Sequence, residues 1–321
     1  MSTRSIKEYA ILAIKGMAMG AADIVPGVSG GTVALITGIY QELLDSLQSL
    51  TPLALKTLWQ QGWAAFWKEI NGGFLLALFI GIALSLKTLA ALVSWCLDHQ
   101  PLLIWSAFSG LIVASLLLLL RHQRWSIAAV LLFFVGAAIV VFIATARPTQ
   151  LPDAPWVLFA GGFVAICAMI LPGISGSFIL LLVGLYPVFL RAIETLDIVA
   201  LASFGLGCVC GLMAFSRFLS WLLARWYAQT MALMLGFLLG SLYVTWPWKR
   251  VVETTVDRHG ELVPLLQVNV SPFQFEQFSG QASQLGLCVL VFAVALASIV
   301  LLEFWAGRRG GAEGSDRELA Q

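Results

Sequence analysis

The chain has 321 residues, of which 60% are hydrophobic and only 11% are charged. Soluble domains are about 25% charged, so this composition excludes a soluble globular protein and indicates an all-α polytopic membrane protein. The formal net charge is +1 and the five cysteines lie in apolar segments without metal-ligand spacing, so neither nucleic-acid binding nor a cysteine metal site is expected.

The amino-terminal half begins with a polar, interrupted hairpin, neither arm of which is an unbroken run of ~20 apolar residues as a membrane span requires. Next, Trp59, Trp63 and Trp67 recur at helical spacing between polar positions. This pattern predicts a helix in the membrane interface, the alternative being a helix packed on the protein surface. The first half (1–150) is expected to contain a hairpin at 5–50, an interfacial helix at 52–70, and spans at about 73–97, 101–120 and 126–146.

The carboxy-terminal half follows the same order and adds a polar insert. Around a Gly-containing turn in the insert, alternating side chains predict a small β-hairpin outside the membrane. The end of the chain is Gly-rich and charged, which predicts a disordered cytoplasmic tail. The second half (151–306) is expected to contain a hairpin at 156–195, spans at about 198–224, 228–247 and 284–306, and an insert at 248–280 with its β-hairpin near 250–270; the tail covers 307–321.

A Pro-Gly-x-Ser-Gly motif occurs twice, at equivalent places in the two hairpins, and a Gly-x-Tyr follows each copy at the same spacing. Proline removes a backbone donor and glycine admits left-handed conformations, so neither copy continues a regular helix. Within a bilayer the freed backbone groups must be satisfied by protein or by a watery cavity. We therefore predict that Pro26-Gly27 and Pro172-Gly173 are the tips of re-entrant or broken hairpins that point into a shared site. A purely structural break is the alternative.

The repeat extends into the spans. Gly81 and Lys87 align with Gly211 and Arg217, so the chain consists of two homologous halves. If the hairpins do not cross the membrane, three full spans separate equivalent points, and this odd number gives two inverted-topology repeats. Lys and Arg are concentrated in the short segments that this topology places inside, so the positive-inside rule predicts that both termini are cytoplasmic.

Lys87 and Arg217 are the main candidates for anion binding, because an intramembrane cation costs ~2.5–3.5 kcal/mol on insertion scales and usually faces a cavity or a partner. Snorkelling toward a headgroup region is the alternative for Arg217. Helices that start after the tips would add backbone donors and a positive dipole end, and neighbouring hydroxyls would add further donors. The predicted phosphate or carboxylate ligands at the tips are Ser29, Gly30, Thr32, Ser175, Gly176 and Ser177.

Two acids break the symmetry between the halves. Asp23 precedes the first tip, where the second half has Met169, and Glu42 follows the first Gly-x-Tyr, where the second half has Val188. Both are candidates for coupling transport to an ion or a proton. They could equally be interface residues or partners of Lys15.

At these residues the chain resembles the PopT-type polyprenyl-phosphate transporters, a bacterial membrane family long described as a domain of unknown function. The resemblance rests on 23–32, 171–176, 236–241 and Trp246-Pro247-Trp248, and it covers about 5–306. It implies a multi-pass protein of the bacterial cytoplasmic membrane, without an organic cofactor, that moves undecaprenyl phosphate from the outer to the inner leaflet. Such a protein would be a transporter rather than an enzyme. A homo-oligomer is left open.

Two other functions stay open at this point. The first is a carrier for a small soluble anion or an ion, built on the same inverted repeats. The second is an integral-membrane polyprenyl-pyrophosphate phosphatase, because such enzymes also use inverted re-entrant hairpins with a Pro-Gly-x-Ser motif. They carry an arginine directly after the motif serine, however, and here Gly30 and Gly176 stand at those positions.

Overall fold

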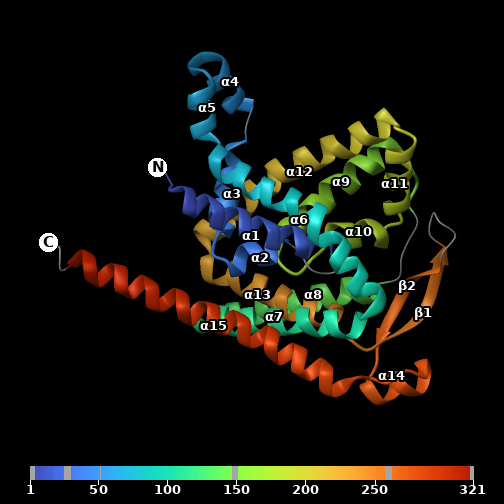
Figure 1. Ribbon diagram of the computed structural model, residues 1–321. Coiled ribbons are helices and arrows are strands. Elements are labelled where there is room, and N and C mark those ends of the chain that lie inside the picture. Colours follow the sequence, from blue (N-terminus) through green and yellow to red (C-terminus); the bar gives the residue numbers. More distant parts are fainter. Residues whose placement is uncertain (1–3, 25–29, 51, 147–150, 257–261, 319–321) are drawn as a thin grey trace.

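The computed structural model describes residues 4–24, 30–50, 52–146, 151–256 and 262–318, and these residues are mostly helical (Figure 1). The helices begin and end close to the proline, glycine and polar joints of the sequence. The first half contains α1 (Ile6–Ile24), α2 (Gly30–Ile36), α3 (Tyr40–Ser49), α4 (Pro52–Gln61), α5 (Trp63–Glu69), α6 (Gly72–His99), α7 (Pro101–His122) and α8 (Ile127–Thr145).

The second half repeats this order and adds two strands. Its elements are α9 (Pro155–Ile170), α10 (Gly176–Leu182), α11 (Tyr186–Glu194), α12 (Ile198–Arg225), α13 (Tyr227–Val244), β1 (Lys249–Val256), β2 (Leu262–Asn269), α14 (Pro272–Ser279) and α15 (Leu285–Glu318).

The helices confirm a multi-pass membrane protein. Within the described residues, α7, α8, α12 and α13 are long and apolar enough to cross a membrane, and the number rises to six if each of two bent helix pairs counts as one span. In one of these pairs α10 and α11 meet at 107° after the second motif, and in the other α5 bends by 72° into α6. The second hairpin is therefore sharply bent at 183–185, between α10 and α11.

Two segments differ from the ranges expected from the sequence. The segment 52–70 forms two helices, α4 and α5, which separate at Gly62. Gly62 has φ +84°, a conformation that only glycine adopts without strain, so the helix breaks there. At the other end of the chain, α15 continues to Glu318 through the stretch that the composition assigned to a disordered tail.

The long helices pack in pairs through glycines. Helix α1 packs along α6 and α9 along α12 within the halves, whereas α8 packs along α13 and α7 along α15 between the halves. Gly81 lies so close to α1 that an added Cβ would be 2.0 Å from the Ala13 carbonyl oxygen, and its equivalent Gly211 meets Phe163 of α9 in the same way. Such small residues allow the close approach that stabilises helix pairs in a membrane.

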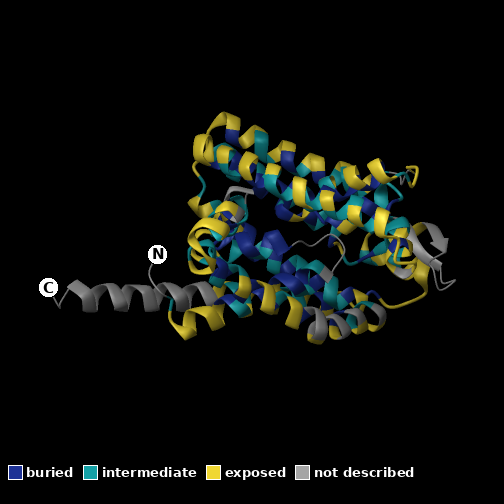
Figure 2. Cartoon of the chain, turned by 90° about the horizontal axis from the view of Figure 1, so that it is seen from above, coloured by how far each residue is buried: buried dark blue, intermediate teal, exposed yellow. Residues whose placement is uncertain are grey.

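The two hairpins enter the molecule from opposite ends. In Figure 1, α3 lies at the end where α1 begins and α15 ends, and α11 lies at the other end, on the side of the β-hairpin. Buried residues gather in the interior, where α2, α9 and α13 contribute to the core, and exposed residues line the outward helix faces (Figure 2). Many of these exposed side chains are large and apolar, Phe79 and Leu131 among them, as a lipid-facing surface requires.

The insert forms an antiparallel hairpin of β1 and β2 that pairs Lys249 with Asn269. At its base the Lys249 ammonium group donates to the Val244 carbonyl at 2.5 Å and lies 4.2 Å from the centre of the Trp105 ring. A cation next to the last carbonyls of a helix and over an aromatic face is favourably placed. Lys249 therefore ties the β-hairpin to the ends of α13 and α7.

Burial lowers the pKa of Lys249 from 10.5 to about 8. Between these values the unfolded chain holds a proton that the folded protein has lost, so stability rises with pH over this window. We expect the melting temperature in detergent to rise between pH about 8 and pH about 10 more for the wild type than for Lys249→Met. A difference between the two proteins that does not change with pH would contradict this prediction.

Candidate functional site

The two hairpins meet at their breaks. The Gly173 amide, in the second tip, donates to the Thr32 hydroxyl oxygen of α2 at 2.8 Å, and this bond is buried. The Tyr40 hydroxyl of α3 donates to the Ile170 carbonyl at 2.9 Å, also buried. Since a break in an intramembrane helix leaves backbone groups without intrahelical partners, the first hairpin supplies a partner for the last carbonyl of α9 and for one amide in the break that follows it.

Close packing accompanies these bonds. A Cβ added at Gly31 would be 2.5 Å from the Ile170 carbonyl oxygen, so only glycine lets α2 approach the end of α9 so closely. Gly173 has φ +84°, and a Cβ there would be 2.7 Å from the Phe237 carbonyl oxygen of α13. The glycines of the motif therefore serve both the turn and the contact between the halves.

The first tip is capped by a carboxylate of its own. Asp23 Oδ1 accepts from the Gly30 amide, the first residue of α2, at 2.7 Å. An acid beside the first amides of a helix is stabilised by the bond and by the helix dipole. Of the other residues predicted for this tip, Pro26, Gly27 and Ser29 lie outside the described residues.

The second tip presents two hydroxyls. Ser175, which precedes α10, is buried, and its oxygen lies 2.9 Å from that of the exposed Ser177. A cavity of about 10 Å³ lies between this tip and α8. A single water needs ~10–15 Å³, so the space is too small for a phosphate. The space between the second tip and α8 is therefore filled in this conformation, whereas Ser177 on the other side of the tip is exposed.

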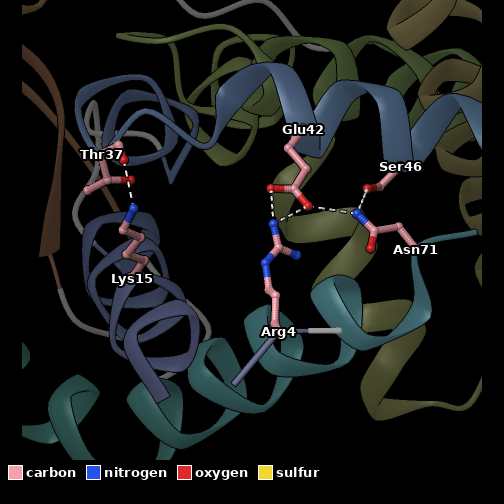
Figure 3. Close-up of polar contacts among 6 residues, drawn as sticks. All are labelled: Arg4, Lys15, Thr37, Glu42, Ser46 and Asn71. Carbon is pink, nitrogen blue, oxygen red and sulfur yellow. Dashed lines mark hydrogen bonds and ion pairs between the residues drawn. The ribbon is translucent and has the colours of Figure 1, made fainter. Parts of the chain in front are cut away.

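A polar cluster lies between the first hairpin and the start of α6 (Figure 3). Both oxygens of Glu42 are 2.7 Å from Arg4 Nη2, and Asn71 Nδ2 donates to Glu42 Oε1 at 2.8 Å and to Ser46 Oγ at 3.1 Å. Asn71 has φ +52°, which asparagine tolerates better than most residues. Glu42 thus joins the chain start, α3 and α6 in one network.

Lys15 lies at the other side of the same hairpin. Its ammonium group donates to the Thr37 carbonyl, just after α2, at 2.8 Å. The carboxyl end of α2 carries a partial negative charge. Lys15, the cation that interrupts the apolar run of α1, is therefore stabilised by the dipole of α2. Sequence reasoning singled out Glu42 but not Arg4 or Asn71 as its partners, because both are distant in sequence and carry no motif.

The two cations predicted for phosphate binding are placed differently. Arg217 is exposed on α12, and its Nη1 donates to the Met213 carbonyl of its own helix at 3.2 Å. Lys87 belongs to α6, and its side chain lies outside the described residues. The structure therefore brings Thr32 to the second tip but does not bring Arg217 to it. Within the described residues no three His, Cys, Asp or Glu side chains gather as a metal site requires.

Comparison with known proteins identifies relatives of the chain. Residues 19–263 match a family described as VCA0040-like, undecaprenyl phosphate translocase-like. A polyprenyl-phosphate transporter of Vibrio cholerae serotype O1 is 47% identical over 294 residues, which is 91% of this chain and 96% of the relative. A polyprenyl-phosphate transporter of Staphylococcus aureus is 30% identical over 253 residues, 73% of this chain and 85% of the relative. No solved structure matches the chain significantly.

Proposed function

The chain belongs to the VCA0040-like family of undecaprenyl phosphate translocase-like proteins, and on that premise we propose that it transports polyprenyl phosphate. The proposed reaction moves undecaprenyl phosphate from the outer to the inner leaflet of the bacterial cytoplasmic membrane, with both termini of the protein in the cytoplasm. The observation that carries this proposal is the meeting of two broken helices at the buried Thr32–Gly173 hydrogen bond, since broken helices form the binding sites of many transporters.

The phosphate is proposed to bind at the tips. Ser175 and Ser177 provide two hydroxyls 2.9 Å apart, and the second tip has Met169 where the first has the capping Asp23. A phosphate at the second tip would therefore not compete with a carboxylate equivalent to Asp23. At the first tip it would have to displace Asp23 from the Gly30 amide before that amide, Ser29 and Thr32 could bind it.

This competition offers a route for coupling. Protonation of Asp23 removes the negative charge that accepts from Gly30 at 2.7 Å, and a neutral acid is a weaker acceptor than a carboxylate. A proton on Asp23 would therefore favour phosphate binding at the first tip. Glu42, by contrast, is held by Arg4 and Asn71, so of the two acids Asp23 is the better candidate.

Lys87 and Arg217 are proposed to neutralise the phosphate as the lipid enters from the bilayer, since Arg217 lies away from the second tip in this conformation. The substrate is itself a lipid that reaches the protein from the bilayer, so the exposed Arg217 on the spanning helix α12 is accessible to its headgroup. The bond of Arg217 to Met213 of its own helix is one that a phosphate can replace with stronger, charge-assisted bonds.

Two inverted repeats would make the site open to each leaflet in turn. Three features support this arrangement. The two hairpins lie at opposite ends of the molecule (Figure 1). Helix α1 packs on α6 as α9 packs on α12, and the remaining helices pair between the halves, α8 with α13 and α7 with α15.

Replacing both Lys87 and Arg217 by glutamine is expected to abolish transfer of undecaprenyl phosphate between the leaflets of liposomes that contain the purified protein. The loss follows because an anion at membrane depth would lose both opposite charges. The matched control is Arg225→Gln, which removes an exposed arginine from the end of the same helix and should leave transfer intact. Normal transfer by a folded double variant would rule out the proposed phosphate role of this pair.

A further inference from the structure

A second feature outside the tips is suited to a lipid chain. A groove of about 430 Å³ lies between α1, α3, α5 and α6, lined by apolar side chains and Gly72. We call it the amino-terminal groove. The side chains along its length are Met19, Leu43, Leu47, Leu75, Phe79 and Ile82.

One end of the groove adjoins the polar cluster. Its lining includes Ile70 and Gly72, which flank Asn71 in the chain, and Leu43, which follows Glu42. Lys15 precedes Met19 by one helical turn and so shares its face of α1. Taken together, the polar cluster and Lys15 on the other side of the hairpin hold two cations (Arg4 and Lys15) and one carboxylate (Glu42), a surplus of one positive charge.

An apolar groove with a cationic rim complements an amphiphilic anion. The size of the groove argues against a protein partner, because one turn of helix with its side chains occupies ~400–600 Å³ and would already fill it. A single hydrocarbon chain is narrower and can follow the groove along α6. The volume is in the range of pockets that hold drug-sized ligands, so the groove fits only a part of a long polyprenyl chain.

We propose that the amino-terminal groove holds the phosphate-proximal part of the polyprenyl chain, with the phosphate at its rim, between Lys15 and the polar cluster of Arg4, Glu42 and Asn71. The inference rests on the proposed function and adds a second binding position for the same lipid, away from the hairpin tips. Lipid tails are as apolar as the groove, so the groove positions the chain and the charged rim supplies the selectivity. The lipid would occupy this position on its way between the tips and the leaflet nearest the chain termini.

The test uses an undecaprenyl phosphate analogue with a photoreactive diazirine in the isoprene units next to the phosphate. Irradiation of the full-length protein in liposomes should label groove residues such as Leu47, Leu75 and Phe79. Unlabelled undecaprenyl phosphate should prevent this labelling, and phosphatidic acid at the same concentration should not. Labelling spread evenly over the lipid-facing helices, or equal competition by phosphatidic acid, would overturn the proposal and indicate an ordinary annular lipid.

Two variants separate the groove from its rim. Leu75→Trp fills the groove and should reduce labelling and transfer several-fold, whereas Leu131→Trp on the exposed face of α8 should change neither. Lys15→Gln should weaken labelling by the phosphate analogue about tenfold, the size of one charge-assisted hydrogen bond, without affecting a neutral polyprenol analogue; Lys15→Arg should restore it. Equal losses for both analogues would refute the rim assignment.

These results also separate the inference from the proposed function. If the wild type transfers undecaprenyl phosphate but the groove is not labelled, the inference fails and the transport function stands. If the wild type transfers nothing, the transport function fails, and with it the inference that depends on it.

Discussion

Thr32→Val is expected to lower the free energy of unfolding by about 1–3 kcal/mol. Valine has nearly the shape of threonine but cannot accept the hydrogen bond from Gly173, whose buried amide would lose its partner. The loss should appear as a lower melting temperature of the protein in detergent and as reduced transfer in liposomes, because the bond joins the two hairpins.

Two further variants make this prediction specific. Thr32→Ser keeps a hydroxyl and should preserve most of the stability. Thr88→Val removes a hydroxyl that bonds only within α6, to the Leu84 carbonyl, from an exposed position, and it should have little effect. Equal melting temperatures for Thr32→Val and Thr88→Val would show that the hydrogen bond between Thr32 and Gly173 does not stabilise the folded protein.

Gly207→Ala is expected to be among the most damaging small substitutions in the protein. Its Cβ would lie 2.0 Å from the Phe159 carbonyl oxygen of α9, and because the obstacle is backbone, α9 and α12 would have to move apart. Overpacking costs about 1–3 kcal/mol or more. The expected result is a large fall in the yield of folded protein and in its melting temperature.

Gly205→Ala is the matched control, two residues earlier on the same helix. A Cβ there meets nothing within 4 Å, and alanine in place of glycine within a helix is favourable by about 0.5–1 kcal/mol. Gly205→Ala should therefore be neutral or slightly stabilising. Similar melting temperatures for the two variants would show that α9 and α12 are not in the close contact described.

The helices were largely predictable from local signals. Expected spans and observed helices agree within three residues at each end for α7, α8, α12 and α13, because runs of apolar residues ended by polar joints are sufficient to define them. The doubled Pro-Gly-x-Ser-Gly motif likewise located the break before α10, and the family resemblance that rested on it is confirmed. The break at Gly62 was not predicted, because a single glycine in the sequence does not show that its φ is positive.

The partners of the site residues were not predictable in the same way. Periodicity shows which residues share a helix face, but not what that face meets. Thr32 and Gly173 are joined across 141 residues, and no local pattern encodes such a contact. Alignment of the halves made Arg217 equivalent to Lys87, but alignment does not fix orientation, and Arg217 lies on an exposed face of α12.

The most direct test of the transport proposal is a leaflet-transfer measurement with the purified wild-type protein. Undecaprenyl phosphate is placed in one leaflet of liposomes, and its appearance in the other is followed with a membrane-impermeant phosphatase, with and without a pH gradient. We expect protein-dependent transfer that inorganic phosphate and sulfate do not inhibit. Transfer no faster than in protein-free liposomes under either condition would contradict it, and uptake of the soluble anions instead would identify a small-anion carrier.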